Sequence, residues 1–156
     1  MIRTFISIII VGTLLLLTPA CSSSKKSSGS SKTINGNWQL RAIVSEGVTG
    51  KINTTLFDEA GFNCFIGSTW HFTTHNNTGY YSISKNGNEC DAAKRAISWN
   101  VDEQADQPKQ FYFKKQGAAD EYRFSIIKLV SDSMQLQSAV IIDGKTASLL
   151  YKFIRI

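Results

Sequence analysis

Hydrophobic and polar residues alternate one by one along most of the chain after residue 33, a pattern typical of strands with one buried and one solvated face. In the stretch 38–45, Trp38, Leu40, Ala42 and Val44 share one side of the predicted strand. The same period predicts eight strands, at residues 38–45, 68–73, 80–84, 95–101, 110–115, 121–130, 133–141 and 145–154. In the sixth of these the alternation changes phase near Ile126, which predicts a β-bulge.

Short connections join most of the predicted strands. The turn at 75–79 is rich in Asn and ends in Gly79, and Asp143-Gly144 is a strong hairpin signal, because Asn and Gly accept left-handed backbone angles. The chain has two prolines and no pattern for a long helix. Eight sequential antiparallel strands can form a sandwich, or they can close into an up-and-down barrel, which removes both sheet edges.

The connection between the first and second strands carries one predicted helix. Thr55 and Asp58 have the spacing of a capping box, although the acidic partner there is usually Glu or Gln. Leu56, Phe57 and Ala60 supply an apolar side, and Gly61 ends the segment. We therefore predict one or two helical turns that lie as a lid over an open end of a barrel.

The first 20 residues have the features of a signal peptide, with Arg3 near the start and an apolar run at 5–17. Cys21 follows Pro19-Ala20, and this junction resembles the lipobox of bacterial lipoproteins, in which the Cys is acylated and becomes the new N-terminus. Ordinary secretory cleavage with a chance cysteine is the alternative. The Ser- and Lys-rich residues 21–32 are predicted to form a lipidated, flexible tether, which leaves 33–156 as the folded domain.

Two cysteines remain in the predicted domain, Cys64 and Cys90. Cysteines exported to an oxidising compartment usually pair, so we predict a disulfide between them. Cys64 directly follows the predicted lid helix and Cys90 lies after the third strand. The bridge would therefore pin the lid to that loop.

The charge distribution argues against nucleic-acid binding. The formal net charge of the 156-residue chain is +5, but Arg3 belongs to the leader and Lys25, Lys26 and Lys32 to the tether. The rest of the positive charge is dispersed, whereas nucleic-acid binding requires a basic patch or stripe.

We find no pattern for catalysis, a metal or a cofactor. The sequence contains neither G-x-S-x-G nor H-E-x-x-H. Asp58 and Glu59 fall in the predicted lid helix, and the acidic residues at 102–106 fall in a solvated loop. His71 and His75 are four residues apart, which would share a face on a helix, but they lie on a predicted strand and turn.

At the head of the first strand, Gly36-Asn37-Trp38 resembles the G-x-W motif of lipocalins. The runs 67–72 and 76–81, the flanking cysteines and the closing run 150–153 resemble the short lipocalin-like lipoproteins of the Bacteroidota, and the resemblance covers 33–156. It implies an all-β, eight-stranded antiparallel up-and-down barrel. It also implies that Gly36 and Trp38 close the floor, with Lys152 or Arg155 against the Trp ring.

The resemblance also bears on location and modification. The export signal of surface lipoproteins in the Bacteroidota resembles a short acidic run after the lipidated Cys. This chain has Ser-Ser-Ser-Lys-Lys at that place instead. We therefore expect a lipid-anchored protein of the cell envelope that faces the periplasm from the outer membrane. Asp132-Ser133-Met134 resembles the short O-glycosylation motif of Bacteroidota envelope proteins, so Ser133 is a candidate modification site.

The predicted inward face is dominated by aromatic rings, and this leaves two functions open. In the first, a non-enzymatic, membrane-anchored lipocalin-like protein binds a small hydrophobic molecule in a pocket. In the second, the barrel is packed solid and its outer loops bind another envelope protein. For the first, the candidate ligand contacts are Trp70, Phe72, Trp99, Phe111, Phe113, Leu56 and Phe57.

Overall fold

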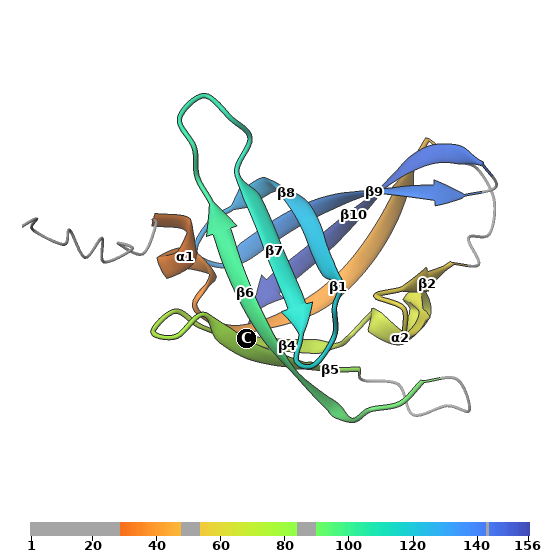
Figure 1. Cartoon of the computed structure of the whole chain (residues 1–156), viewed down its shortest axis with the longest axis horizontal. Coiled ribbons are helices and arrows are strands. Elements are labelled where there is room, and N and C mark those ends of the chain that lie inside the picture. The colour runs from red at the N-terminus through yellow and green to blue at the C-terminus, as the bar shows by residue number, and fades with distance from the viewer. Residues whose placement is uncertain (1–28, 48–53, 84–89, 143) are drawn as a thin grey trace, which may run out of the picture.

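Eight strands of the computed structural model close into one antiparallel barrel in the order β1-β10-β9-β8-β7-β6-β5-β4, which confirms the predicted fold (Figure 1). The structure describes residues 29–47, 54–83, 90–142 and 144–156, so the predicted signal peptide and most of the tether lie outside the described residues. The barrel strands are β1 (Gly36–Glu46), β4 (Thr69–Thr73), β5 (Thr78–Ser82), β6 (Lys94–Asp102), β7 (Gln110–Lys115), β8 (Glu121–Leu129), β9 (Ser133–Ile142) and β10 (Lys145–Arg155).

Barrel closure depends on β1, which is long enough to pair with two strands. Its first residues, Gly36 to Gln39, pair with β4, and Trp38 to Glu46 pair with β10. All remaining neighbours in the barrel are consecutive in the chain, so the topology is a simple meander. Among the described residues, no helix is long and apolar enough to cross a membrane.

Two bulges change which side chains face inward. The register of β8 shifts between Ile126 and Lys128, which confirms the predicted bulge. A second, unpredicted shift lies between Leu40 and Ala42 in β1. The inserted residue reverses the alternation. Ile43 therefore packs against the core, whereas Val44, which we predicted to share the inward face, is 39% exposed.

The predicted lid helix at 55–61 is wrong in position. These residues form a hairpin of β2 (Thr55–Leu56) and β3 (Ala60–Gly61), and the short helix α2 (Phe62–Phe65) follows. Phe57 and Asp58 have φ angles of 55° and 50°, and the Glu59 amide donates to the Leu56 carbonyl over 3.1 Å. Two successive positive φ angles closed by this hydrogen bond are those of a type I′ turn, and a right-handed helix cannot contain them.

The predicted tether is wrong for its last four residues. Residues 29–32 belong to the helix α1 (Gly29–Ile34), whose side chains Ser30, Ser31 and Ile34 are buried against the barrel. The low hydrophobicity of this Ser-rich run gave no helical signal, since Ile34 is its one large apolar residue. Figure 1 shows α1 at one end of the barrel and β2 with α2 at the other.

The predicted disulfide is present. Cys64 in α2 and Cys90 before β6 are bonded, with their Cα atoms 5.4 Å apart. Cys64 is 4% exposed and belongs to the core, against which Cys90 also packs. The bridge thus fastens the segment that follows the β2–β3 hairpin to the start of β6.

Candidate binding site

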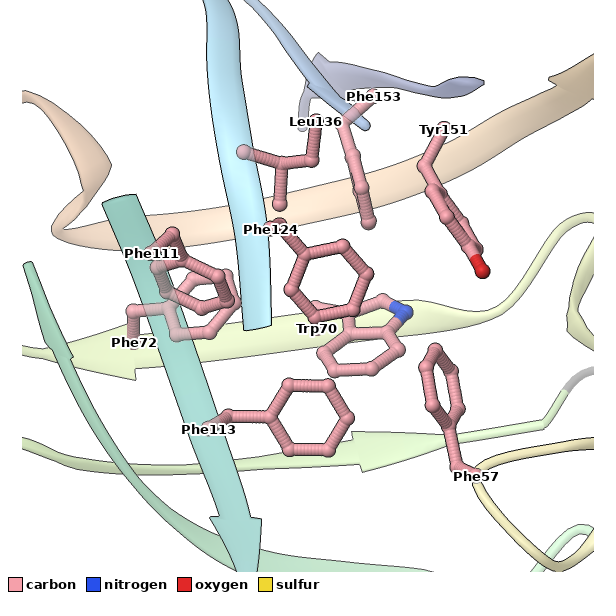
Figure 2. Close-up of a pocket in the computed structure, with 9 residues that line it drawn as sticks. All are labelled: Phe57, Trp70, Phe72, Phe111, Phe113, Phe124, Leu136, Tyr151 and Phe153. Atoms are coloured by element: carbon pink, nitrogen blue, oxygen red, sulfur yellow. The ribbon is translucent and has the colours of Figure 1, made fainter. Parts of the chain in front are cut away.

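The centre of the barrel is filled by side chains (Figure 2). The space left between them is about 10 Å³, which is the room of a single water molecule. A pocket for a drug-sized ligand needs about 300 Å³ or more. Eight of the nine lining side chains are aromatic, and the full set is Phe57, Trp70, Phe72, Phe111, Phe113, Phe124, Leu136, Tyr151 and Phe153.

Five of the seven candidate ligand contacts line this space, namely Phe57, Trp70, Phe72, Phe111 and Phe113. Trp99 and Leu56 are also buried, at 3% and 4% exposed, but they do not line it. Trp99 instead packs beside Phe72 and Phe111, and its Nε1 donates to the Thr78 carbonyl over 2.9 Å.

The sequence-based choice of contacts missed four lining residues: Phe124, Leu136, Tyr151 and Phe153. The two-residue period does put all four on the inward face of their strands. It does not say at which height along the barrel each lies, since that depends on the register between strands.

One lining residue, Phe57, comes from outside the barrel strands. Its ring makes edge contacts with Phe65 and Phe113 at 5.0 Å and with Tyr122 at 5.1 Å between centroids. Figure 2 shows this ring reaching from the hairpin turn toward Trp70. A bulky residue at positive φ costs about 1–2 kcal/mol, so the packing of the ring must offset backbone strain.

The next residues of the turn are held by polar groups at the barrel mouth. Tyr81 Oη donates to Glu59 Oε2 over 2.5 Å, and Arg95 Nη2 lies 2.6 Å from Glu59 Oε1. Lys115 Nζ donates to the Phe57 carbonyl over 2.6 Å and lies 4.0 Å from Glu59 Oε2. The prediction that Glu59 lies in the lid helix is wrong, since it lies in the turn between β2 and β3, and its carboxylate anchors that turn.

Two phenols act as donors to this turn. Burial, together with the hydrogen bond to Glu59, raises the pKa of Tyr81 far above its ordinary value. Tyr122 Oη donates to Asp58 Oδ2 over 3.0 Å, and burial with this bond raises the pKa of Tyr122 in the same way. Both phenols therefore stay protonated and able to donate throughout the neutral range.

The opposite end of the barrel is sealed by Trp38. Its ring is fully buried, and its Nε1 donates to the Ile34 carbonyl of α1 over 2.6 Å. Of the two basic candidates, Arg155 stacks on this ring at 4.3 Å and Lys152 is exposed. The Arg155 guanidinium also donates to the carbonyls of Thr33, Asn35 and Ser131.

Gly36 makes room for that arginine. Its φ is +119°, a backbone angle that side chains resist, and a Cβ there would lie 2.6 Å from Arg155 Nη1. Gly36 and Trp38 thus have the geometry expected of residues that close the barrel floor.

No metal centre is visible in the described part of the chain, where no three His, Cys, Asp or Glu side chains gather. His71 is instead in contact with the Asn37 amide oxygen, 2.6 Å from its Nδ1. Ser133, the candidate modification site, is the partly buried first residue of β9.

The closed meander, the sealed floor and the aromatic interior define a small up-and-down β-barrel domain. The model of the lipocalin-like domain family matches residues 34–136, about two thirds of the chain, and the chain belongs to that family. No curated protein matches this sequence.

Solved structures to which this chain is similar include those of the bovine odorant-binding protein. A deswapped triple mutant of that protein is 19% identical, with 80% of this chain and 74% of that chain covered and a TM-score of 0.45. The bovine protein with its natural ligand is 17% identical, with 84% and 75% covered and a TM-score of 0.45. Its complex with a selenium-containing odorant is 16% identical, with 86% and 78% covered and a TM-score of 0.46.

Proposed function

We propose that this protein is a non-enzymatic carrier that binds a small hydrophobic molecule inside the barrel when the Phe57 turn moves aside. The proposal rests on one observation: the ring that fills the mouth of the barrel comes from a turn outside the barrel strands. Phe57 is the one described lining residue that belongs to no barrel strand. The barrel can therefore open without breaking its own ladder of hydrogen bonds.

The size of the ligand follows from what Phe57 would vacate. Its ring lies against Trp70, Phe113, Phe124 and Tyr151, all of which line the interior. An apolar cavity of about 150 Å³ stays dry and binds a molecule as small as benzene. A ligand the size of one ring, not a long lipid chain, therefore fits this interior.

A titration of the folded protein with toluene tests the proposal. We expect Phe57→Ala to bind toluene at least tenfold more tightly than wild type, measured by calorimetry, because the variant need not displace a ring. Ile127→Ala is the control, since that side chain is 52% exposed on β8 and should leave the affinity unchanged. A folded Phe57→Ala variant with no affinity for toluene would contradict the proposal.

A packed barrel that acts as a protein-interaction module in the cell envelope is the second candidate. The observation that favours it is the free space of about 10 Å³, which leaves no room for a ligand while Phe57 is in place. Failure of both wild type and Phe57→Ala to bind toluene, with a defined envelope protein recovered by crosslinking, would favour this function.

We also propose that Cys21 carries a lipid and anchors the protein to the membrane on the periplasmic side. The lipobox-like junction before Cys21 supports this. Seven residues separate Cys21 from α1, a reach of at most about 30 Å, so the sealed floor would face the membrane and the mouth would point away. Labelled palmitate should enter wild type and not Cys21→Ala, and equal labelling of both would contradict the anchor.

A further inference from the structure

We infer that the turn Phe57-Asp58-Glu59 occupies the binding site as a stand-in for the ligand, and that the ligand is a small carboxylate carrying one ring. The ring of the ligand would replace Phe57, and its carboxylate would replace that of Glu59. The inference rests on the proposed function, because it names the chemistry of the molecule that the barrel takes.

The apolar half of this site is shaped for a flat ring. Phe57 meets Phe65 and Phe113 edge-on, with interplanar angles of 89° and 77°. It lies more nearly parallel to Tyr151, at an angle of 25°. Edge and offset contacts of this kind are those that aromatic rings prefer. A ring-bearing ligand keeps these contacts, whereas a flexible chain does not.

The charged half of the site is shaped for a carboxylate. Glu59 receives the Tyr81 hydroxyl and the Arg95 guanidinium, with Lys115 nearby, and its side chain is 14% exposed. The side chains of Arg95 and Lys115 are 17% and 21% exposed. When the turn leaves, both cations lose Glu59, and a partly buried charge without its partner is costly.

The consequence is largest for Lys115. Both polar partners that the structure gives its Nζ atom, the Phe57 carbonyl and the Glu59 carboxylate, belong to the turn. Arg95 keeps its ion pair with Asp91 at 3.0 Å, so it loses only one of its two carboxylate partners when the turn leaves. A neutral or cationic ligand would leave Lys115 with only the Tyr122 ring, 5.9 Å from its Nζ atom, whereas a carboxylate restores the negative charge that the turn supplied.

The two halves of the site are close together. Tyr81 holds Glu59 through its hydroxyl, and its ring stacks on Trp70 at 4.4 Å with an interplanar angle of 21°. Trp70 in turn lines the interior and contacts Phe57. One aromatic residue therefore joins the carboxylate position to the ring position, and a linker of a few bonds spans them.

A basic depression leads to the same two cations from outside. It is an open hollow of about 630 Å³ at the start of β6 and the β7–β8 turn, lined by Lys94, Arg95, Ala96, Lys115, Gln116, Gly117 and Ala118. Three of these described lining residues are cationic and none is acidic. While the turn is in place, Arg95 and Lys115 are paired with Glu59. Once the turn leaves, the three cations of this hollow favour the approach of anions.

The test compares 3-phenylpropionate with its neutral isostere 3-phenylpropionamide, both by calorimetry. Wild type should bind the carboxylate at least fivefold more tightly than the amide. The variant Phe57→Ala/Glu59→Gln removes the ring from one half of the site and the negative charge from the other, and we expect it to bind the carboxylate at least tenfold more tightly than the amide. With Phe57→Ala alone, Glu59 still occupies the anion position, so the preference for the carboxylate should disappear.

Lys115→Met in the background of the double variant is the matched control. It should lower the affinity for the carboxylate by a larger factor than the affinity for the amide, and so reduce the preference, while Arg95 and Tyr81 still hold the carboxylate. If the double variant binds both probes equally, the inference that the ligand is a carboxylate is wrong, whereas the proposed binding of a small hydrophobic molecule is unaffected. If neither probe binds any folded variant, the proposed function fails as well. Circular dichroism shows which variants are folded. The comparison of the two probes on wild type tests the inference even if a variant does not fold.

Discussion

The two ends of this barrel are closed in different ways. At the floor, Trp38 is covered by Arg155, and the arginine is fixed by three backbone carbonyls. At the mouth, Phe57 is held by the short β2–β3 hairpin, in whose turn Phe57 and Asp58 have positive φ angles. The floor closes with elements that are part of the barrel, since Trp38 and Arg155 are paired neighbours in β1 and β10.

The difference indicates which end can open. Opening the floor would break the β1–β10 ladder and separate α1 from Trp38. Opening the mouth breaks side-chain contacts to Phe57, Asp58 and Glu59 and relieves strained backbone at the first two of these. Regions that move in binding are drawn from the least stable parts of a fold. The mouth is therefore where a ligand would enter.

The largest effect that tests this comparison is the loss of Trp38. Trp38→Ala should lower the free energy of unfolding by about 4 kcal/mol, because it leaves a large cavity and removes the surface on which Arg155 stacks. Urea unfolding measures the loss. Lys152→Ala, at an exposed position on the same strand as Arg155, should change the value by less than about 0.5 kcal/mol. A loss at Trp38 smaller than that at Phe57→Ala would contradict the ranking of the two ends.

The disulfide provides the next largest effect. Its two cysteines are 26 residues apart, so Cys64→Ser/Cys90→Ser should cost about 3 kcal/mol by the chain-entropy model. The bridge fastens α2, so its loss should also speed amide hydrogen exchange at Glu59 more than at Trp38. Equal acceleration at the two ends would show that the bridge stabilises the whole barrel and not the mouth in particular.

The strained turn gives a smaller effect with an unusual sign. Phe57→Gly and Phe57→Ala both remove the ring, but glycine accepts the φ angle of 55° and alanine does not. We expect the glycine variant to be the more stable of the two by about 1 kcal/mol in urea unfolding. The same pair of substitutions at Phe113, in the middle of β7, should give the opposite order. A more stable alanine variant at residue 57 would mean that the turn is not strained.

The sequence predicted the barrel well because buried and exposed side chains alternate along most of its strands. In β6 the residues Ile97, Trp99 and Val101 alternate with exposed ones, so burial can be read from the period alone. The rule failed in β1, where the bulge after Leu40 moves Val44 outward. Near its bulge, β1 has apolar residues on both faces, so the alternation shows no change of phase. The bulge near Ile126 does change the phase of the alternation, and it was predicted.

The site was harder to predict because it depends on contacts between distant residues. Thr55, Leu56 and Ala60 have the spacing of a helix, and the hairpin is favoured only because Phe57 can enter a ring-lined interior and Glu59 can reach Arg95. Phe113, which the Phe57 ring contacts, lies 56 residues further along the chain, and Arg95 lies 36 residues after Glu59. Local propensity is a weak prior that such tertiary contacts override.

The last prediction concerns the phenols at the mouth, whose effect on stability depends on pH. Burial first, and then the bonds to Glu59 and Asp58, raise the pKa of Tyr81 and of Tyr122 above that of an unfolded tyrosine, which is about 10. A group with a higher pKa in the folded state stabilises the fold fully below its unfolded value, and this contribution is lost as the pH rises above it. Stability should therefore hold between pH 7 and about 9 and fall above about 10.

Tyr81→Phe separates this effect from general alkaline unfolding. At pH 7 it should cost about 1.5 kcal/mol, the lower end for a hydrogen bond to a charged group, while the loss of melting temperature between pH 9 and about 11 becomes smaller than in wild type. Burial also raises the pKa of Tyr151, so some alkaline loss should remain in the variant. An unchanged alkaline loss in Tyr81→Phe would mean that this phenol does not help to hold the mouth closed. In that case, raising the pH to about 10 should speed amide hydrogen exchange by the same factor at the floor and at the mouth. The two ends would then not differ in how easily they open.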